Sequence, residues 1–142
     1  MIGLLLISHG PLAEGLRDSY CFFNDEMEAM EVLCLQEGED PLCFHHQLAQ
    51  VCDRLDQGEG LLIMSDIPGG SPANQALILK QEGNHAIHII SGCNLLMVLE
   101  AYISRNFMDL ETLCAHCVAK GKESIMELKL EEEAEEDDDA EF

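Results

Sequence analysis

Short apolar runs alternate with longer segments of helical periodicity along most of the chain. Apolar runs of about four to eight residues that end at Gly, Pro or Ser are typical of buried strands. Apolar runs of this length occupy residues 2–8, 30–35, 61–65 and 85–90, and all but the run at 30–35 end at such a residue. Apolar residues that recur every three or four positions predict helices. Such segments occupy residues 11–23, 41–56, 72–81, 94–104 and 109–119.

The residues at the start of each predicted helix support these boundaries. Pro11 suits a first helical turn, because its fixed φ fits and its missing N–H has no partner there. Asp40, Ser71, Asn94 and Asp109 are natural N-caps, and Asp40 and Ser71 each precede a proline. In the first helix the spacing predicts that one side carries Leu12, Leu16, Ser19 and Phe23.

The order of elements predicts an α/β fold. Strands that alternate with helices form a mainly parallel, open sheet with helices on both faces, joined by right-handed crossovers. Residues 124–130 alternate weakly and predict a last strand, expected to be antiparallel at the edge of the sheet. No linker or repeat divides residues 1–130, so we expect one domain there.

Charge and composition narrow the function. The 142-residue chain has a formal net charge of −21, which disfavours nucleic acid and anionic membranes as partners. Nine acids and no base fall in residues 131–142, which predicts a disordered acidic tail. The apolar start carries no cation before Arg17, so a signal peptide is not expected. Seven cysteines, an odd number, indicate reduced thiols and a cytoplasmic location.

Two side chains are predicted to meet at one edge of the sheet. His9 follows the first strand and Asp66 follows the third. Ligands of such sheets bind at the carboxyl ends of the strands. A carboxylate bonded to one imidazole nitrogen fixes the tautomer and leaves the other nitrogen nucleophilic. His9 and Asp66 are therefore the predicted catalytic pair.

The loop after Asp66 predicts an anion site. Gly69 and Gly70 allow main-chain N–H groups to turn outward, Ser71 adds a hydroxyl, and the following helix adds its positive end. We expect Gly69, Gly70, Ser71 and Gly10 to contact phosphate, with Ser8 and Asn94 supporting them. The chain lacks a Walker lysine, which argues against nucleotide hydrolysis and favours phosphoryl transfer through histidine.

These motifs resemble the IIA proteins of the mannose family of the bacterial phosphoenolpyruvate-dependent sugar phosphotransferase system (PTS). The resemblance rests on Ser8-His9-Gly10, on Asp66-x-x-Gly69-Gly70-Ser71-Pro72 with Asn74, and on Ser91-Gly92-Cys93-Asn94-Leu95 with Glu100-Ala101, in order over residues 1 to about 125. It implies that His9 takes a phosphoryl group from HPr and passes it to a IIB component, which serves membrane IIC and IID subunits. It also implies a homodimer, in some members with an exchanged last strand. We expect no metal or cofactor, because the reaction exchanges one phosphohistidine for another.

Other functions stay open at this point. A IIA-like module phosphorylated at His9 could regulate rather than transport, or serve a dihydroxyacetone kinase system. Cys114 and Cys117 have zinc-like spacing but lack a second pair. Cys43, His45, His46 and Cys52 share one predicted helix, in which His46 faces away from His45 and Cys52. We interpret both groups as ordinary helix residues and expect no metal site.

Overall fold

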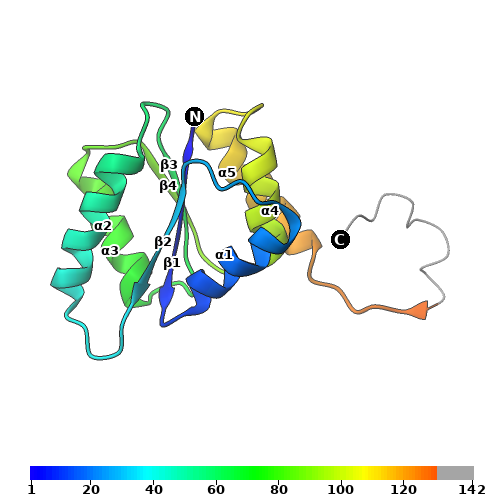
Figure 1. Cartoon of the computed structure of the whole chain (residues 1–142), viewed down its shortest axis with the longest axis horizontal. Helices are drawn as coiled ribbons and strands as arrows, with labels where there is room; N and C mark the ends of the chain where they lie inside the picture. Colours follow the sequence, from blue (N-terminus) through cyan, green and yellow to red (C-terminus); the bar gives the residue numbers. More distant parts are fainter. Residues whose placement is uncertain (131–142) are drawn as a thin grey trace.

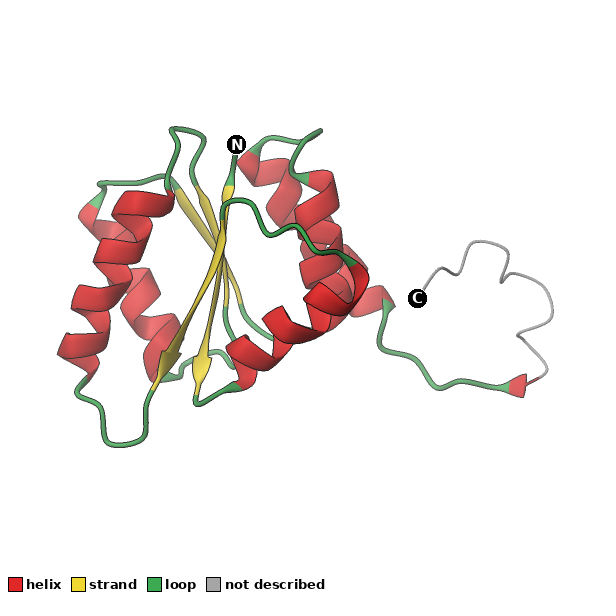
Figure 2. Cartoon of the chain, in the orientation of Figure 1, coloured by secondary structure: helices red, strands yellow, loops and turns green. Residues whose placement is uncertain are grey.

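The computed structural model describes residues 1–130 and consists of one sheet between two layers of helices (Figures 1 and 2). Its strands are β1 (Gly3–His9), β2 (Met30–Leu35), β3 (Leu61–Met64) and β4 (Ile87–Ile90). Its helices are α1 (Leu12–Phe23), α2 (Pro41–Leu55), α3 (Ser71–Glu82), α4 (Leu95–Ser104) and α5 (Leu110–Glu123). The predicted tail, residues 131–142, lies outside the described residues.

The sheet of the described residues has the strand order β2-β1-β3-β4, and every pairing is parallel. Helices α2 and α3 cover one face, and α1, α4 and α5 cover the other (Figure 1). β1 is buried along its length up to His9, so its residues alternate between the two apolar clusters on either side of the sheet. The prediction of a parallel sheet with helices on both faces is confirmed.

The C-terminal end of the described chain differs from the prediction. Helix α5 continues to Glu123 rather than ending near residue 119, and residues 125–129 form neither helix nor strand. The predicted antiparallel edge strand over residues 124–130 is therefore wrong for the single chain. Instead, the segment runs away from the sheet (Figure 1) and exposes its apolar side chains. These are Ile125, Met126, Leu128 and Leu130.

The buried face of α1 is shifted by one position from the predicted one. Ala13 and Tyr20 are buried, whereas Leu12 is 48% exposed. The hydroxyl of Tyr20 donates to the carbonyl of Glu26 at 2.6 Å, so a polar tip is satisfied inside the apolar layer. Within residues 1–130, none of the helices combines the length and apolar character needed to cross a membrane.

Arg105 fixes the edge of the sheet opposite His9. It follows α4, is 4% exposed, and its guanidinium lies 4.4 Å from the centre of the Tyr102 ring. Nη1 donates to the carbonyls of Ile2 and Ala29, both at 3.0 Å, and Nη2 donates to the carbonyl of Glu28. One side chain therefore ties α4 to the starts of β1 and β2.

Replacing Arg105 by Met should lower the free energy of unfolding by about 3 kcal/mol. Met keeps much of the apolar volume but leaves the carbonyls of Ile2 and Glu28 without the guanidinium donor, and each such loss costs roughly 1–3 kcal/mol. The carbonyl of Ala29 keeps the N–H of Leu4. Urea unfolding measures the change. Arg54→Met is the control, because Arg54 pairs with Glu31 at 2.7 Å on the surface, where ion pairs contribute little. Equal unfolding midpoints for the two variants would contradict this role of Arg105.

At the edge of the sheet opposite His9, His85 bridges two carboxylates. Its Nδ1 lies 2.7 Å from Asp56 Oδ2, and its Nε2 lies 2.8 Å from Asp53 Oδ1. Because carboxylates only accept, both bonds require a doubly protonated imidazolium. Burial lowers the pKa of His85, but the bonds to Asp56 and Asp53 outweigh burial and raise that pKa above its ordinary value.

Stability should therefore fall as the pH rises above neutrality. A raised folded-state pKa contributes stability that is fully present below the unfolded pKa of about 6.5. That contribution is lost as the pH rises through the folded pKa of His85. Urea midpoints between pH 6 and pH 9 measure this, with His85→Gln as the variant that does not titrate. Parallel pH profiles for the two proteins would show that His85 is not responsible.

Candidate functional site

The candidate site lies where β1 and β3 end. His9 is the last residue of β1, and Asp66 follows β3 by two residues. These strands are neighbours in the sheet, with Leu6 paired to Met64, so the two side chains emerge side by side. The predicted convergence of His9 and Asp66 is what the structure shows.

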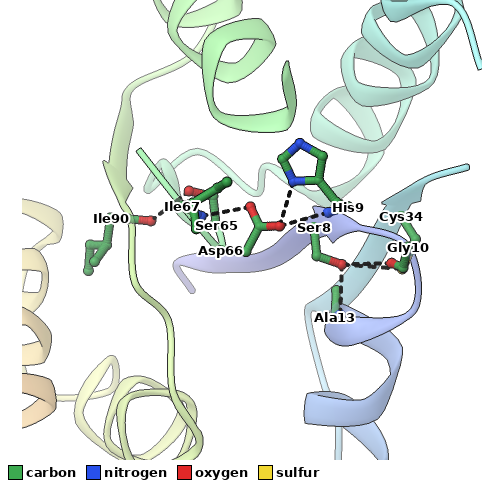
Figure 3. A network of polar contacts seen from close by, with 9 residues as sticks. All are labelled: Ser8, His9, Gly10, Ala13, Cys34, Ser65, Asp66, Ile67 and Ile90. Atoms are coloured by element: carbon green, nitrogen blue, oxygen red, sulfur yellow. Dashed lines mark hydrogen bonds and ion pairs between the residues drawn. The ribbon is translucent and has the colours of Figure 1, made fainter. Parts of the chain in front are cut away.

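One carboxylate oxygen holds the histidine at two points (Figure 3). Asp66 Oδ2 lies 2.7 Å from His9 Nδ1 and accepts the main-chain N–H of His9 at 2.8 Å. Asp66 Oδ1 accepts the N–H of Ile67 at 2.8 Å. The Asp66 side chain is 9% exposed, whereas that of His9 is 44% exposed. The carboxylate is thus enclosed, and the imidazole that it orients remains accessible.

The hydrogen bonds around Asp66 define the tautomer of His9. Burial raises the pKa of Asp66, but the bonds from the His9 main chain, the His9 ring and Ile67 outweigh burial and hold that pKa below its ordinary value. An ionised carboxylate only accepts, so Nδ1 carries the proton in the Nδ1–Asp66 bond. In the neutral ring, Nε2 then has a free lone pair. Figure 3 shows Nε2 on the side of the ring away from Asp66.

Gly70 packs directly against the free side of the imidazole. A Cβ built on Gly70 would lie 2.5 Å from His9 Cε1 and 3.1 Å from Nε2. A larger residue at this position would displace the imidazole through close approach, whereas the backbone angle, with a φ of −79°, would suit any residue. The start of α3 is thereby brought next to Nε2.

The N-terminus of α3 is uncapped by a side chain. Ser71 was predicted as the N-cap, but the N-cap is Gly70 and Ser71 is the first helical residue. Within the first turn, Pro72 has no N–H, whereas the N–H groups of Ser71 and Ala73 have no preceding helical carbonyl to bind. A positive helix end with free donors is suited to an anion.

A side chain to which no role was assigned from the motifs, that of Asn74, holds the loop before α3. Asn74 Nδ2 donates to the carbonyl of Gly69 at 3.1 Å, and Gly69 has a φ of +82°. An amide one turn into the helix thus fixes the left-handed residue of the Gly-Gly turn. The presence of Asn74 in the motif was the available signal.

Ser8 and Gly10 lie on either side of His9 and belong to the turn between β1 and α1. Ser8 Oγ donates to the carbonyl of Gly10 and accepts the N–H of Ala13, both at 2.8 Å. Gly10 has a φ of +60°, a conformation that favours glycine. The two residues fix the main chain around His9.

Asn94 is the N-cap of α4, as predicted, and it also contacts the end of α5. Its Oδ1 accepts the N–H of Met97 as the N-cap of α4, and its Nδ2 donates to Gly121 and Ser124 at the end of α5. In the same loop, the N–H of Gly92 donates to the carbonyl of Asp66 at 2.8 Å. This loop therefore supports the site through the Asp66 main chain.

A cavity of about 470 Å³ opens beside the histidine, lined by His9, Gly10 and residues 35–39. Glu37 and Glu39 place carboxylates on its wall. Glu39 is held by bonds from the Gln36 main chain at 2.9 Å and from Gln47 at 3.1 Å. The approach to His9 is therefore acidic.

The cysteine clusters have the properties of structural residues. All seven cysteines fall within the described residues and are free thiols. Burial raises the pKa of both Cys52 and Cys117 to about 12, and burial also raises the pKa of Cys114. Residues 1–130 contain no group of three or more His, Cys, Asp or Glu side chains arranged to hold a metal ion.

The fold and the site define an α/β protein that presents a carboxylate-supported histidine beside the open N-terminus of a helix. Residues 3–118 match the EIIA-man family, described as the PTS system fructose IIA component. Because this match covers most of the chain, the chain belongs to the mannose family of PTS IIA proteins. The resemblance inferred from the motifs is confirmed.

Individual relatives agree with this assignment. The mannose-specific EIIAB component of the PTS from Escherichia coli K12 is 27% identical over 129 residues, or 90% of this chain. That alignment covers 40% of the relative, so this chain spans about two-fifths of the length of the curated relatives it matches.

Solved structures share the fold. The PTS component EIIA from Streptococcus agalactiae has a TM-score of 0.83 at 23% identity, covering 89% of this chain and 97% of that one. The PTS IIA protein associated with the fucose utilization operon of Streptococcus pneumoniae has a TM-score of 0.77 at 27% identity, with 88% and 91% coverage.

Proposed function

We propose that this IIA protein carries a phosphoryl group on Nε2 of His9, taken from phospho-HPr and passed to a IIB component of a sugar PTS. The observation that carries the proposal is the bond of 2.7 Å between His9 Nδ1 and Asp66 Oδ2. It leaves Nε2 unprotonated next to the free N-terminus of α3. A nucleophile and an anion site thus share one position.

The proposed step exchanges one phosphohistidine for another. Nε2 attacks the phosphorus, the P–N bond to the HPr histidine breaks, and that imidazole leaves with the electron pair. Asp66 balances the positive charge that develops on the His9 ring. The N–H groups of Ser71 and Ala73, with the Ser71 hydroxyl and the end of α3, stabilise the phosphoryl oxygens. The reaction needs positioning and electrostatics but no metal.

The acidic surface beside His9 favours the binding of protein partners with basic surfaces. Glu37 and Glu39 line the cavity beside His9, and the chain as a whole carries a net charge of −21. Basic surfaces on HPr and IIB would be drawn to this edge. We place the protein in the cytoplasm with these partners, since its seven free cysteines suit a reducing compartment.

We also propose a homodimer, supported by an open sheet edge. In the described residues, β4 pairs with β3 on one side only. A groove of about 400 Å³ runs along its other side, between β4 and α5. The exposed apolar segment 125–130 of a second copy has the length and side chains to fill this edge. Sedimentation equilibrium should therefore give the mass of a dimer.

Phosphoryl uptake tests the carrier function. The protein is incubated with phosphoenolpyruvate, enzyme I and HPr, and its intact mass is followed. Wild type should gain one acid-labile, base-stable phosphoryl group, and His9→Ala should gain none. His46→Ala, which removes an exposed histidine on α2, should be phosphorylated like wild type. Failure of wild type where a control IIA protein is phosphorylated, or phosphorylation of His9→Ala, would overturn the proposal.

A further inference from the structure

The residue before the histidine is enclosed and yet polar. Ser8 is 1% exposed. Successive side chains of a strand point to opposite faces, so Ser8 faces α1 while His9 faces α3. Ser8 therefore touches neither the imidazole nor anything that docks on it. Any contribution that it makes to phosphoryl transfer is exerted through the main chain.

The Ser8 hydroxyl closes the turn between β1 and α1 (Figure 3). It donates to the carbonyl of Gly10 at 2.8 Å and accepts the N–H of Ala13 at 2.8 Å. The N–H of Gly10 donates in turn to the carbonyl of Leu35 at 2.8 Å. Both polar groups of Gly10 are thus fixed, one by Ser8 and the other by β2.

This closure bears directly on His9, which lies between Ser8 and Gly10. The main-chain N–H and ring Nδ1 of His9 converge on the single oxygen Asp66 Oδ2, at 2.8 and 2.7 Å. Two bonds from one residue to one atom require a fixed main chain at that residue. Gly10, with a φ of +60°, is the flexible point next to it.

The Ser8 hydroxyl also accepts a main-chain N–H at the start of α1. The N–H of Ala13 lies in the first turn, where it would otherwise lack a partner. Ser8 satisfies it from outside the helix, whereas the N-cap residue of α3 provides no side-chain bond to its own helix. Because Ser8 binds the N–H of Ala13, that group does not compete for the phosphoryl group. The N–H groups in the first turn of α3 remain available to bind the phosphoryl group.

We propose that Ser8 is a positioning residue for phosphoryl transfer, holding the turn after His9 so that Asp66 keeps the ring proton on Nδ1. This inference rests on the proposed carrier function. It makes Ser8 a determinant of the rate of transfer, without contact to substrate or partner.

Kinetics with phospho-HPr form the first part of the test. Ser8→Ala should lower kcat about 10- to 100-fold, since small misplacements of reacting groups have effects of this order. Its KM for phospho-HPr should stay within about twofold, because a residue 1% exposed does not meet the partner. Ser8→Thr, which retains the hydroxyl, should recover most of the rate. Ser8→Cys, of similar size, replaces Ser8→Ala if that variant does not fold.

Nitrogen NMR of the unphosphorylated protein forms the second part. In wild type, His9 Nε2 should show the shift of an unprotonated nitrogen at a pH where the ring is neutral. Ser8→Ala should move this shift towards that of a protonated nitrogen, as the Nδ1–H tautomer loses population. Ser104→Ala is the matched control, because Ser104 is 8% exposed and its hydroxyl lies 3.3 Å from His116 Nε2, in the α4–α5 layer.

The outcomes separate the two proposals. If wild type is phosphorylated but Ser8→Ala matches Ser104→Ala in kcat and in the Nε2 shift, the positioning role is wrong. A raised KM with unchanged kcat would also overturn it. If wild type gains no phosphoryl group, the carrier function fails, and the Nε2 shifts alone still decide whether Ser8 controls the tautomer.

Discussion

Replacing Asp66 by Asn should lower the rate of phosphoryl uptake by a factor on the order of 10³. The carboxylate accepts from Nδ1 at 2.7 Å, so it keeps Nε2 free. An asparagine amide has N–H groups to donate to Nδ1, which favours the tautomer with the proton on Nε2. Losing the correct tautomer costs about 10⁴ in an analogous aspartate–histidine pair of serine proteases.

The measurement is a rapid-quench time course with phospho-HPr. Asp40→Asn is the control, because Asp40 caps α2 at the same edge by accepting the N–H of Leu42 at 3.0 Å. Asn is an equally good N-cap, so that variant should keep both its rate and its stability. An Asp66→Asn rate within about threefold of wild type would show that Asp66 does not set the tautomer.

Replacing Gly70 by Ala should lower the rate about 100-fold with little change in stability. The new Cβ would lie 2.5 Å from His9 Cε1, a distance that forces the ring to move. The φ of −79° is one that alanine adopts freely, so the backbone itself is not strained. The effect is therefore displacement of the nucleophile from the N-terminus of α3.

Gly15→Ala is the matched control for this substitution. Gly15 lies in α1, and a Cβ there meets no atom within 4 Å. Alanine should raise the free energy of unfolding by about 0.5–1 kcal/mol, through helix propensity, and leave transfer unchanged. If Gly70→Ala transfers at the wild-type rate, then the close approach of α3 to His9 is not part of the mechanism.

The order of the strands and helices up to α5 could be predicted because each of these elements rests on local signals. Short apolar runs placed the four strands, and polar N-caps marked the starts of α2, α4 and α5. The adjacency of His9 and Asp66 followed from the rule that parallel strands end at one edge. The sequence could not predict that one oxygen, Asp66 Oδ2, accepts from both the main-chain N–H and the ring Nδ1 of His9, because this geometry depends on the register of β1 and β3.

The structure differs from the prediction where contacts between elements, rather than local sequence, determine the position of a residue. On α1 the predicted side began at Leu12, but packing against the sheet selected Ala13 and Tyr20. Asn94 caps α4 as predicted, whereas the contact of its amide with the end of α5 depends on how the two helices pack. The last strand failed in the single chain because a strand needs a hydrogen-bonded neighbour, and β4 receives none from residues 124–130 of its own chain.

The ring nitrogen that carries the phosphoryl group decides whether His9 acts through Nε2 as proposed. Phosphorylated, nitrogen-labelled protein is prepared with enzyme I and HPr, and phosphorus–nitrogen couplings are measured at His9. We expect coupling to Nε2, with Nδ1 still protonated and bonded to Asp66. Phosphate on Nδ1, or on any residue other than His9, would contradict it.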